Sequence, residues 1–500
     1  MANGFTGALR TRHDAWKLSA ANAWHPDLLW YAKAIASIHL KGITNPVCWR
    51  YQAAIHDYTP GNDPFAVPGE AMPSAADQKS FWKQCQHGSW FFLPWHRIYL
   101  YYFEAIIAST VVALGGPQDW ALPYWNYSDA GNPDALKLPP AFTAAKLPDG
   151  TTNALHVAAR KHGLNTGGAI SKHAVSLTCL TDGAFTRTTP SAPVGFGGPK
   201  TIFSHGGPTP GALENVPHGA VHVAVGGPTG WMSSFDTAAL DPIFWVHHAN
   251  IDRLWEVWRK RNATYVNPTD PAWLHGAGAA FRLHDATGAV GALTVPSQVV
   301  DTTAAPLHYT YQDLSDPLAP AAPAPAPHVF SVTSSVPPPA HPAEMVGASS
   351  APTTLGAGSV VEHIDLAEPT GPVAHVAGAG AAAPGASGRH VYLHLENVRA
   401  PSRAPSYAVY VNLPQGADPG AHEENYAGLL SMFGVAEASR ASSEHGGGGL
   451  TYVLDITDLV ARLAAAGTWD PKTIHVSFVL ADDDKPVSGV TVGRVSVYYH

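Results

Sequence analysis

The stretch that decides the fold runs from Glu214 to Trp258 and reads ENVPHGAVHVAVGGPTGWMSSFDTAALDPIFWVHHANIDRLWEVW. Its pattern predicts one helix over 217–225 and a longer helix over 242–261. His218 and His222 are four residues apart, so on a helix their imidazoles share one face, about 40° apart. The residues between them include no glutamate, which excludes the HExxH zinc-protease motif. The pair therefore fits either two ligands of one metal ion or two structural histidines.

The longer helix of this stretch supplies a third candidate ligand. His248 lies on this helix, and Asp252 follows it one helical turn later. Carboxylates commonly orient metal-binding histidines through the ring nitrogen that faces away from the metal. We therefore expect Asp252 to fix the tautomer and the orientation of an imidazole.

A second cluster of histidines comes from the N-terminal part of the chain. His56 lies in AAIHDY, and His87 and His96 lie in CQHGSWFFLPWHRIYLYYFE. Each of them alone is typical of a hydrogen-bonded core histidine. Together the two clusters predict two metal sites built from neutral imidazoles. Imidazole suits copper, zinc, iron and nickel alike, so the residues leave the metal open.

Composition narrows the class of protein. The chain has 500 residues, 13% of them charged, with 27 histidines and a net charge of −9. The length predicts two or three domains, and the lack of long basic runs predicts no nucleic-acid partner. Three cysteines cannot build a disulfide framework. The N-terminus lacks a signal-peptide pattern and no long apolar run occurs, so we expect no membrane contact and a cytoplasmic location.

Helices, a linker and strands follow one another along the chain. Helices are expected over 28–40, 47–56 and 95–114, and another from Ser74 toward Cys85. Nine prolines between Pro317 and Pro342 predict a linker, because proline disfavours helix and sheet alike. Beyond the linker, short β-branched segments predict antiparallel strands over 389–398, 407–413, 428–435, 451–456, 473–480 and 490–499.

Two runs of sequence resemble a known family. HGSWFFLPWHRIYLYYFE, which begins at His87, and DPIFWVHHANID, which begins at Asp241, closely resemble the two copper signatures of the tyrosinase and polyphenol oxidase family of type-3 copper proteins. In these signatures the later of the paired histidines is the ligand, so His247 is read as structural. His39 is an alternative to His56, around which the motif is loose. The resemblance implies two copper ions, one bound by His56, His87 and His96 and the other by His218, His222 and His248.

The same resemblance implies an enzyme. It implies oxidation of o-diphenols to o-quinones with O2, and it leaves a preceding ortho-hydroxylation of monophenols open. The implied partners are small phenols, catechols and O2, and the oligomeric state is left open. An oxygen carrier of the hemocyanin kind is the alternative, because it shares the dicopper core and differs only in substrate access. A structural protein with histidine-rich packing is a further alternative, and it would bind no copper.

The resemblance also singles out four residues near the expected ligands. Glu214 matches a family glutamate that orients a water for deprotonating the phenol, or else it is an acid at a helix N-terminus. Gly219 stands where strong monophenol hydroxylases carry asparagine. Phe235 matches a bulky gate above the copper, or else it is a core aromatic. Cys85 has the spacing to His87 at which some relatives form a thioether, although a buried thiol would look identical in sequence.

Outside the copper signatures the resemblance is to plant polyphenol oxidases. DPAWL from Asp270 and LHYTYQD from Leu307 resemble their short middle region, in which Tyr309 and Tyr311 match a tyrosine motif that closes the catalytic domain. The C-terminal strands resemble the domain that covers the copper site of those enzymes and keeps them latent. We therefore expect the C-terminal domain to act as a lid.

The expected fold class combines two architectures. A mainly α catalytic domain holds the dicopper centre in a helical bundle, and a C-terminal antiparallel β-sandwich follows it. The expected boundaries are a catalytic domain over 1–265, a short middle region over 266–316, a proline-rich linker over 317–345 and the β-sandwich over 346–500.

Overall fold

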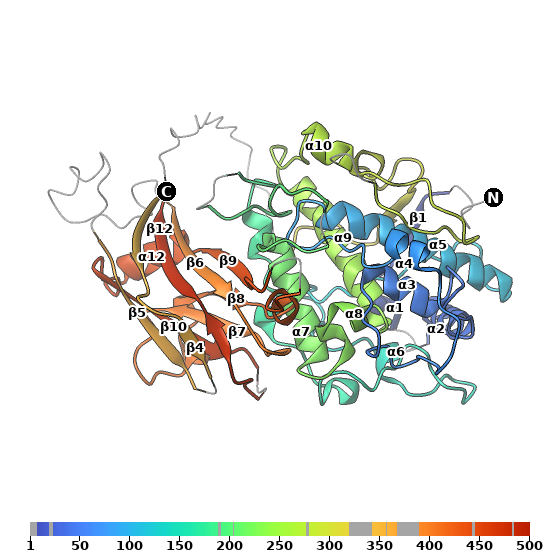
Figure 1. Cartoon of the computed structure of the whole chain (residues 1–500), viewed down its shortest axis with the longest axis horizontal. Coiled ribbons are helices and arrows are strands. Elements are labelled where there is room, and N and C mark those ends of the chain that lie inside the picture. Colours follow the sequence, from blue (N-terminus) through green and yellow to red (C-terminus); the bar gives the residue numbers. More distant parts are fainter. Residues whose placement is uncertain are drawn as a thin grey trace.

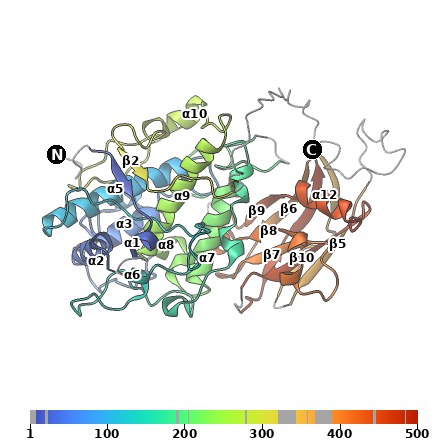
Figure 2. The same ribbon diagram turned by 180° about the vertical axis from the view of Figure 1, so that it is seen from behind.

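The structure is a computed structural model of the whole chain, in which a mainly helical part and a strand-rich C-terminal part lie side by side (Figures 1 and 2). It describes residues 8–19, 24–188, 192–203, 205–276, 280–319, 343–356, 358–367, 390–442, 446–482 and 485–500. Most of the expected linker, residues 320–342, therefore lies outside the described residues.

The helical part contains the segments that carry the candidate ligands. Between them lie long connections with short 3-10 turns. Its α-helices are α1 (Ala15–Ser19), α2 (Pro26–His39), α3 (Trp49–His56), α4 (Ala75–Phe81), α5 (Phe92–Ala113), α6 (Pro140–Thr143), α7 (Ala220–Gly226), α8 (Phe235–Ala238), α9 (Ile243–Arg261) and α10 (Pro271–Leu274). In the described part of the chain, none of the helices combines the length and apolar character needed to cross a bilayer.

The cap of α4 is confirmed, although the helix is shorter than expected. The Ser74 hydroxyl accepts a hydrogen bond from the backbone N–H of Asp77 at 3.1 Å, which satisfies one of the free donors at the helix start. The helix ends at Phe81 and does not continue to Cys85. The expected helices over 28–40 and 47–56 correspond to α2 and α3.

Two other helices differ from the expectation at their starts. α5 begins at Phe92, so Pro94 lies in the first turn, where its missing N–H would be unpaired in any helix. The helix expected over 217–225 is divided into two segments. A π-helical turn, η4 (Glu214–Gly219), contains the non-helical residue Val216 and is followed directly by α7. This division places Glu214 inside the helical segment and not before it.

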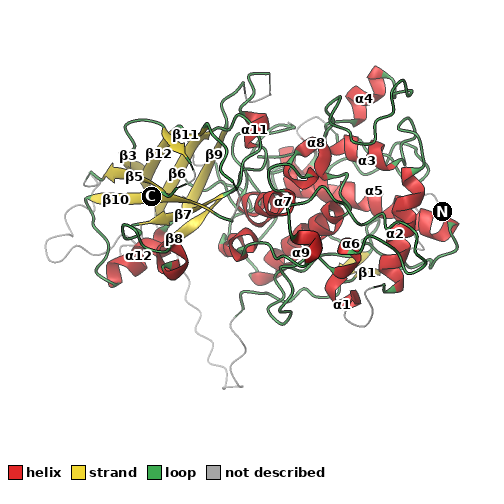
Figure 3. Ribbon diagram, turned by 90° about the horizontal axis from the view of Figure 1, so that it is seen from below, coloured by secondary structure: helices red, strands yellow, loops and turns green. Residues whose placement is uncertain are grey.

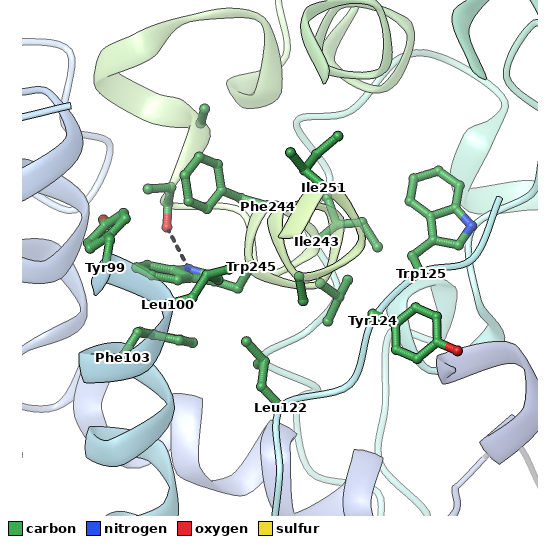
Figure 4. Close-up of a cluster of buried hydrophobic side chains, with 14 of the residues drawn as sticks. Tyr99, Leu100, Phe103, Leu122, Tyr124, Trp125, Ile243, Phe244, Trp245 and Ile251 are labelled. Atoms are coloured by element: carbon green, nitrogen blue, oxygen red, sulfur yellow. Dashed lines mark hydrogen bonds between the residues drawn. The ribbon is translucent and has the colours of Figure 1, made fainter. Parts of the chain in front are cut away.

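Buried side chains of α5 and α9 pack together in one hydrophobic cluster (Figure 4). The Phe103 and Trp245 rings stack with centroids 3.4 Å apart and planes 10° apart. The indole N–H of Trp245 donates to the carbonyl of Ala239 at 3.2 Å, which fixes the ring within this core. Because both helices are buried over most of their length, their packing also fixes the positions of His96 and His248.

A buried ionic network joins these helices to two short parallel strands, β1 (Arg10–Arg12) and β2 (Tyr309–Tyr311). Asp252 accepts hydrogen bonds from the hydroxyls of Tyr309 at 2.6 Å and Tyr311 at 2.5 Å, and from Arg97 Nε at 2.5 Å. The expectation that Asp252 orients an imidazole is therefore wrong. Buried arginines need a counter-charge, and among the described residues Asp252 bonds to these partners and to no histidine.

The C-terminal part contains two four-stranded antiparallel sheets and a short strand pair. The strand orders are β5-β10-β7-β8 and β3-β12-β6-β9, and β4 pairs with β11. Side chains from both four-stranded sheets share one hydrophobic cluster. The bounds are β3 (Glu344–Ala348), β4 (Thr353–Leu355), β5 (Val360–Asp365), β6 (Val391–Val398), β7 (Tyr407–Val411), β8 (Tyr426–Leu430), β9 (Leu450–Asp455), β10 (Thr473–Leu480), β11 (Val490–Val492) and β12 (Arg494–Tyr499), with helices α11 (Val435–Ala438) and α12 (Thr457–Ala465) between them.

The segment expected as a strand over 428–435 is a strand only in its first half. β8 ends at Leu430, and a turn at Gly434, with φ of +77°, leads into α11. Such a backbone conformation suits glycine because it has no Cβ. A Cβ on Gly434 would lie 2.6 Å from the ring of Phe235, so this turn packs closely against the helical part.

Polar contacts join the C-terminal part to the helical part on the side where α7 lies (Figure 3). Asn215 Nδ2 donates to the carbonyl of Leu429 at 3.2 Å, and Arg403 donates to that of Gly230 at 2.9 Å. Ion pairs add to these contacts, namely Lys161 with Asp482 at 3.0 Å and Lys172 with Glu423 at 2.8 Å. The interface thus combines hydrogen bonds and partly exposed ion pairs with apolar contacts, since Ala408, Tyr410 and Leu429 belong to the hydrophobic cluster of the helical part.

Candidate metal centre

Six buried histidines from six separate segments face one another inside the helical part. Ring centroids lie 5.2 Å apart for His56 and His87, 4.7 Å for His218 and His222, and 4.5 Å for His96 and His248. The structure therefore brings all six expected rings into one cluster. His56 ends α3, His87 precedes α5, His96 lies in α5, His218 in η4, His222 in α7 and His248 in α9.

Four of these rings are oriented by backbone carbonyl groups. Nδ1 of His56 bonds to the carbonyl of Phe235 and Nδ1 of His222 to that of Met232, both at 2.8 Å. His96 and His218 use the carbonyl four residues earlier on their own helical segments, at 2.8 and 3.1 Å. A carbonyl only accepts, so Nδ1 carries the proton and the lone pair of Nε2 is free to bind a metal.

The inward ring nitrogens fit metal ligands. Nε2 of His56, His87, His96 and His218 has no hydrogen-bond partner among the described residues, although all four atoms are buried. Buried polar atoms are normally paired, so this convergence indicates a site for a ligand. Burial lowers the pKa of His56 to about 4 and those of the other five rings well below 6.5. The rings are therefore neutral imidazoles, which is the form that binds metals.

Donor atoms close enough to share an ion form two groups. One contains His218, His222, His247 and His248, and the other contains His56, Cys85 and His87. His96 lies between them, with its ring centroid 5.4 Å from that of His87. The geometry thus admits His247 beside His248, and only the family signature favours the later of the two.

Phe433, from the loop between β8 and α11, covers the centre. Its ring stacks on that of His222 with centroids 4.1 Å apart and planes 15° apart, and it lies 5.6 Å from His218. On its other side it contacts the ring of Phe235 at 4.7 Å. The sequence gives no signal for this role, because Phe433 falls in a segment whose pattern predicts a strand. The C-terminal part therefore contributes an aromatic side chain directly above the histidines.

Glu214 borders a small cavity beside these rings. The space measures about 30 Å³, enough for a water molecule or two and too small for a phenol. The carboxylate accepts hydrogen bonds from the N–H of Gly88 at 2.8 and 3.0 Å and from that of Gly211 at 3.3 Å. Burial raises the pKa of Glu214 to about 8, and these N–H groups oppose that shift.

Phe235 and Gly219 also line this cavity. The Phe235 ring stacks on His87 with centroids 4.3 Å apart and planes 8° apart. A Cβ on Gly219 would lie 2.8 Å from Ser431 Oγ and 3.3 Å from Phe433 Cβ. Glycine at this position therefore lets the C-terminal part approach the first helical turn of the centre.

Cys85 lies beside the centre with a partner that the sequence does not predict. Its Sγ is 3.2 Å from Nδ1 of His205, and Nε2 of His205 is 3.6 Å from the carboxylate of Asp57. His39 lies elsewhere, 5.1 Å from the rings of Trp49 and Phe65, and it belongs to neither group of donor atoms among the described residues. The structure thus places His56, and not His39, at the centre.

Comparisons with known proteins agree with this geometry. Residues 46–261 match the family described as the common central domain of tyrosinase, and residues 342–500 match a domain family of unknown function. The chain has the overall fold of latent apple tyrosinase, with a TM-score of 0.62 at 20% identity over 98% of this chain and 97% of that one. A latent aurone synthase gives a TM-score of 0.60 at 18% identity, over 98% of this chain and 89% of that chain.

Two proteins of similar sequence are named as a polyphenol oxidase and a tyrosinase. A polyphenol oxidase of Vicia faba is 33% identical over 257 residues, which are 48% of this chain and 39% of the plant protein. A tyrosinase of Hahella sp. (strain CCB-MM4) is 33% identical over 504 residues, which cover 98% of this chain and 99% of that protein. The chain belongs to the tyrosinase family, the copper-dependent enzymes that oxidise phenols with a pair of copper ions.

Proposed function

We propose that this protein oxidises o-diphenols to o-quinones with O2, with ortho-hydroxylation of monophenols as a weaker second activity. The copper pair supplies the binding and reduction of O2 when it is bound. One observation carries the proposal: six buried neutral imidazoles converge, and most of their inward nitrogens have no partner among the described residues. A set of neutral ligands suits copper in both oxidation states of a redox cycle.

We assign the ligands as two groups of three. His56, His87 and His96 would hold one ion, and His218, His222 and His248 would hold the other. The free Nε2 atoms support this assignment for four of the six. For His222 and His248 the support is that their Nε2 atoms approach to 3.2 Å, as two ligands of one ion do.

The surrounding residues have separate roles in this proposal. Glu214, anchored by the N–H groups of Gly88 and Gly211, orients a water that takes the proton of an incoming phenol. Phe235 packs against the aromatic ring of the substrate as a gate. Gly219 supplies no polar side chain that would help Glu214 hold this water, which is why we place monophenol hydroxylation second.

The C-terminal part is proposed to keep the enzyme latent. Phe433 occupies the place above His218 and His222 that a substrate ring would need. We retain the boundaries 1–265, 266–316, 317–345 and 346–500 as a proposal, with the two sheets packed as a β-sandwich around their shared core. Displacement of this domain would then open the site to phenols.

Quinone formation from catechol by the copper-loaded protein tests the proposed activity. We expect O2 consumption and an increase in quinone absorbance that the metal-free protein does not give. Reversible O2 binding without quinone formation would favour the oxygen carrier. The relatives described above are named as a tyrosinase and a polyphenol oxidase, which favours the enzyme.

The proposed thioether between Cys85 and His87 has its own test. Its formation would break the S–H bond of Cys85 and one ring C–H bond of His87 and form a C–S bond, so that two protons and two electrons leave, with O2 as the oxidant that accepts them. Mass spectrometry of the copper-treated chain would then show a mass lower by two hydrogens, with the change mapped to the peptide that contains both residues. An unchanged mass would leave Cys85 as a buried thiol hydrogen-bonded to His205.

A further inference from the structure

Two histidines lie directly opposite each other on the face of a C-terminal sheet that turns away from the core shared by the two sheets. Farther along this face, Ala408 and Tyr410 pack against the helical part, and among the described residues neither histidine belongs to the donor groups of the dicopper centre. His363 lies on the edge strand β5 and His475 on the neighbouring strand β10. Their ring centroids are 4.3 Å apart and their planes make an angle of 66°. His363 is exposed and His475 is half-buried, so a solvent ion can reach the pair.

The core of the sheet fixes this pairing. The next residues along each strand, Ile364 and Val476, are almost fully buried and point into the shared hydrophobic cluster. Side chains alternate between the two faces of a strand, so burial of these neighbours turns both imidazoles outward. A slip of one residue would expose the core side chains, which makes the register strongly specified.

Among the described residues, neither imidazole ring has a hydrogen-bond or ion-pair partner. The backbone N–H of His475 donates to Asn412 Oδ1 at 2.9 Å, which fixes the strand and does not occupy the ring. Asp365, two residues beyond His363, lies on the same face and is exposed. The pair is therefore a preorganised bidentate nitrogen donor with a carboxylate nearby.

We propose that His363 and His475 bind one divalent transition-metal ion at the surface of the C-terminal part, separate from the catalytic pair. Directly opposed residues on antiparallel strands have Cβ atoms about 5 Å apart, a separation at which two imidazoles can chelate one ion. Imidazole favours borderline ions, and among divalent first-row metals Cu2+ binds such donors most tightly. The ion would tie the edge strand β5 to β10 and so stabilise the sheet.

The test uses the full-length protein already loaded at its catalytic centre and freed of excess copper. Equilibrium dialysis against Zn2+, a redox-inert probe, and then against Cu2+ measures the additional metal bound per chain. His363→Ala and His475→Ala each remove one imidazole, and loss of either ligand should weaken the additional site about tenfold or more. The matched control is His422→Ala, because His422 lies in the same C-terminal part and its ring bonds to Glu424 and to no other histidine among the described residues.

We expect the wild type and the His422 variant to take up one more ion than either variant of the pair. Added Zn2+ should also raise the melting temperature of the first two proteins more than that of the others, because a ligand stabilises the state that binds it. The rate of catechol oxidation should be the same in the wild type and in all three variants. Equal uptake by all four proteins, or a loss confined to the His422 variant, would overturn the proposal.

Discussion

Four of the six imidazoles at the centre are oriented by the group that their outer ring nitrogen meets. All four donate to backbone carbonyls, so their orientation is set by the helical backbone and not by a carboxylate. This arrangement adds no negative charge around the ligands. Glu214 is an acid that lines the cavity beside these rings, and burial raises its pKa to about 8.

Glu214→Gln separates the two activities at the level of one residue. The amide keeps the size of the side chain but holds a water far less well for proton abstraction, which general-base catalysis needs. We expect monophenol hydroxylation to fall by about 10²-fold or more, with a much smaller effect on diphenol oxidation. Steady-state rates with a matched phenol and catechol measure this ratio, and an equal fall in both would contradict the assigned role.

Phe433→Ala tests whether one side chain blocks the site. Removing the ring uncovers His218 and His222, so we expect oxidation of small catechols to increase by about tenfold or more, as a larger fraction of molecules becomes accessible. Met432→Ala is the matched control, because Met432 is equally buried but belongs to the core of the C-terminal sheets. If both variants gained activity alike, general loosening and not unblocking would be the cause.

At the residue scale, the sequence predicted the site residues whose spacing along the chain matches a known ligand pattern. HxxxH on a helix and the two copper signatures predicted five of the six rings, whereas His56 lies outside these motifs and had His39 as an alternative. Phe433 was not predictable, because its role depends on a contact between residues more than two hundred positions apart. The role of Asp252 was predicted wrongly, because spacing on one helix says nothing about arginines that arrive from β1 and α5.

At the scale of elements, the network around Asp252 joins α5, α9, β1 and β2. Burial alone would raise the pKa of Asp252, but the charges of Arg97 and Arg12 outweigh it and lower that pKa below 3.8. Asp252→Ala leaves two buried arginines short of a counter-charge, which should cost about 3–5 kcal/mol of unfolding free energy. Asp134→Ala removes the exposed pair with Lys137 and should cost about 0–1 kcal/mol.

The pH dependence of this loss follows from the direction of the shift. A lowered pKa in the folded state stabilises the protein above the unfolded-state pKa of about 3.9, and this stabilisation disappears as the pH falls through the folded value. The difference between wild type and Asp252→Ala in urea unfolding should therefore be largest near neutral pH and shrink in acid. A difference that does not change with pH would indicate that packing, and not charge, is lost.

Elements were predictable where periodicity is strong and ambiguous where it is not. α9 and β10 match their predicted ranges closely, because apolar residues recur along them with the spacing of a helix and a strand. β3, β4 and β5 were not predicted, since they are short and lie in sequence rich in alanine, glycine and proline. Tertiary pairing with β12, β11 and β10 makes them strands.

At the scale of the whole molecule, the two parts meet closely at Gly219, where a Cβ would also approach Phe433 Cβ to 3.3 Å and the carbonyl of Glu214 to 3.2 Å. Gly219 leaves room for Ser431, and a Cβ there would approach its hydroxyl to 2.8 Å. Gly219→Ala should therefore push the C-terminal part outward and raise diphenol oxidation in the full chain. The same substitution in a chain that ends at residue 319 should change the rate little, because Ser431 is absent. A similar gain in both forms would place the effect inside the catalytic part.

Truncation before Pro320 tests the lid as a whole. It removes Phe433 together with every contact that the C-terminal part makes around the centre, including the pairs of Lys161 and Lys172. Phe433→Ala opens only the space of one ring, so it should favour small catechols. In the truncated chain the oxidation rate should instead increase most for bulky diphenols, because the C-terminal residues around Phe433 are removed as well.

The oxidation rates of small and bulky diphenols are compared between the Phe433→Ala variant and the truncated chain. This comparison shows whether the single side chain of Phe433 or the whole C-terminal part blocks access to the site. Copper content, measured on each protein before the assay, separates loss of the lid from loss of the metal. If the truncated chain keeps two copper ions per chain and yet oxidises bulky diphenols no faster than the full chain, the C-terminal part does not limit access. Its apolar contact with His222 would then serve to stabilise the ligand helix α7 and not to regulate it.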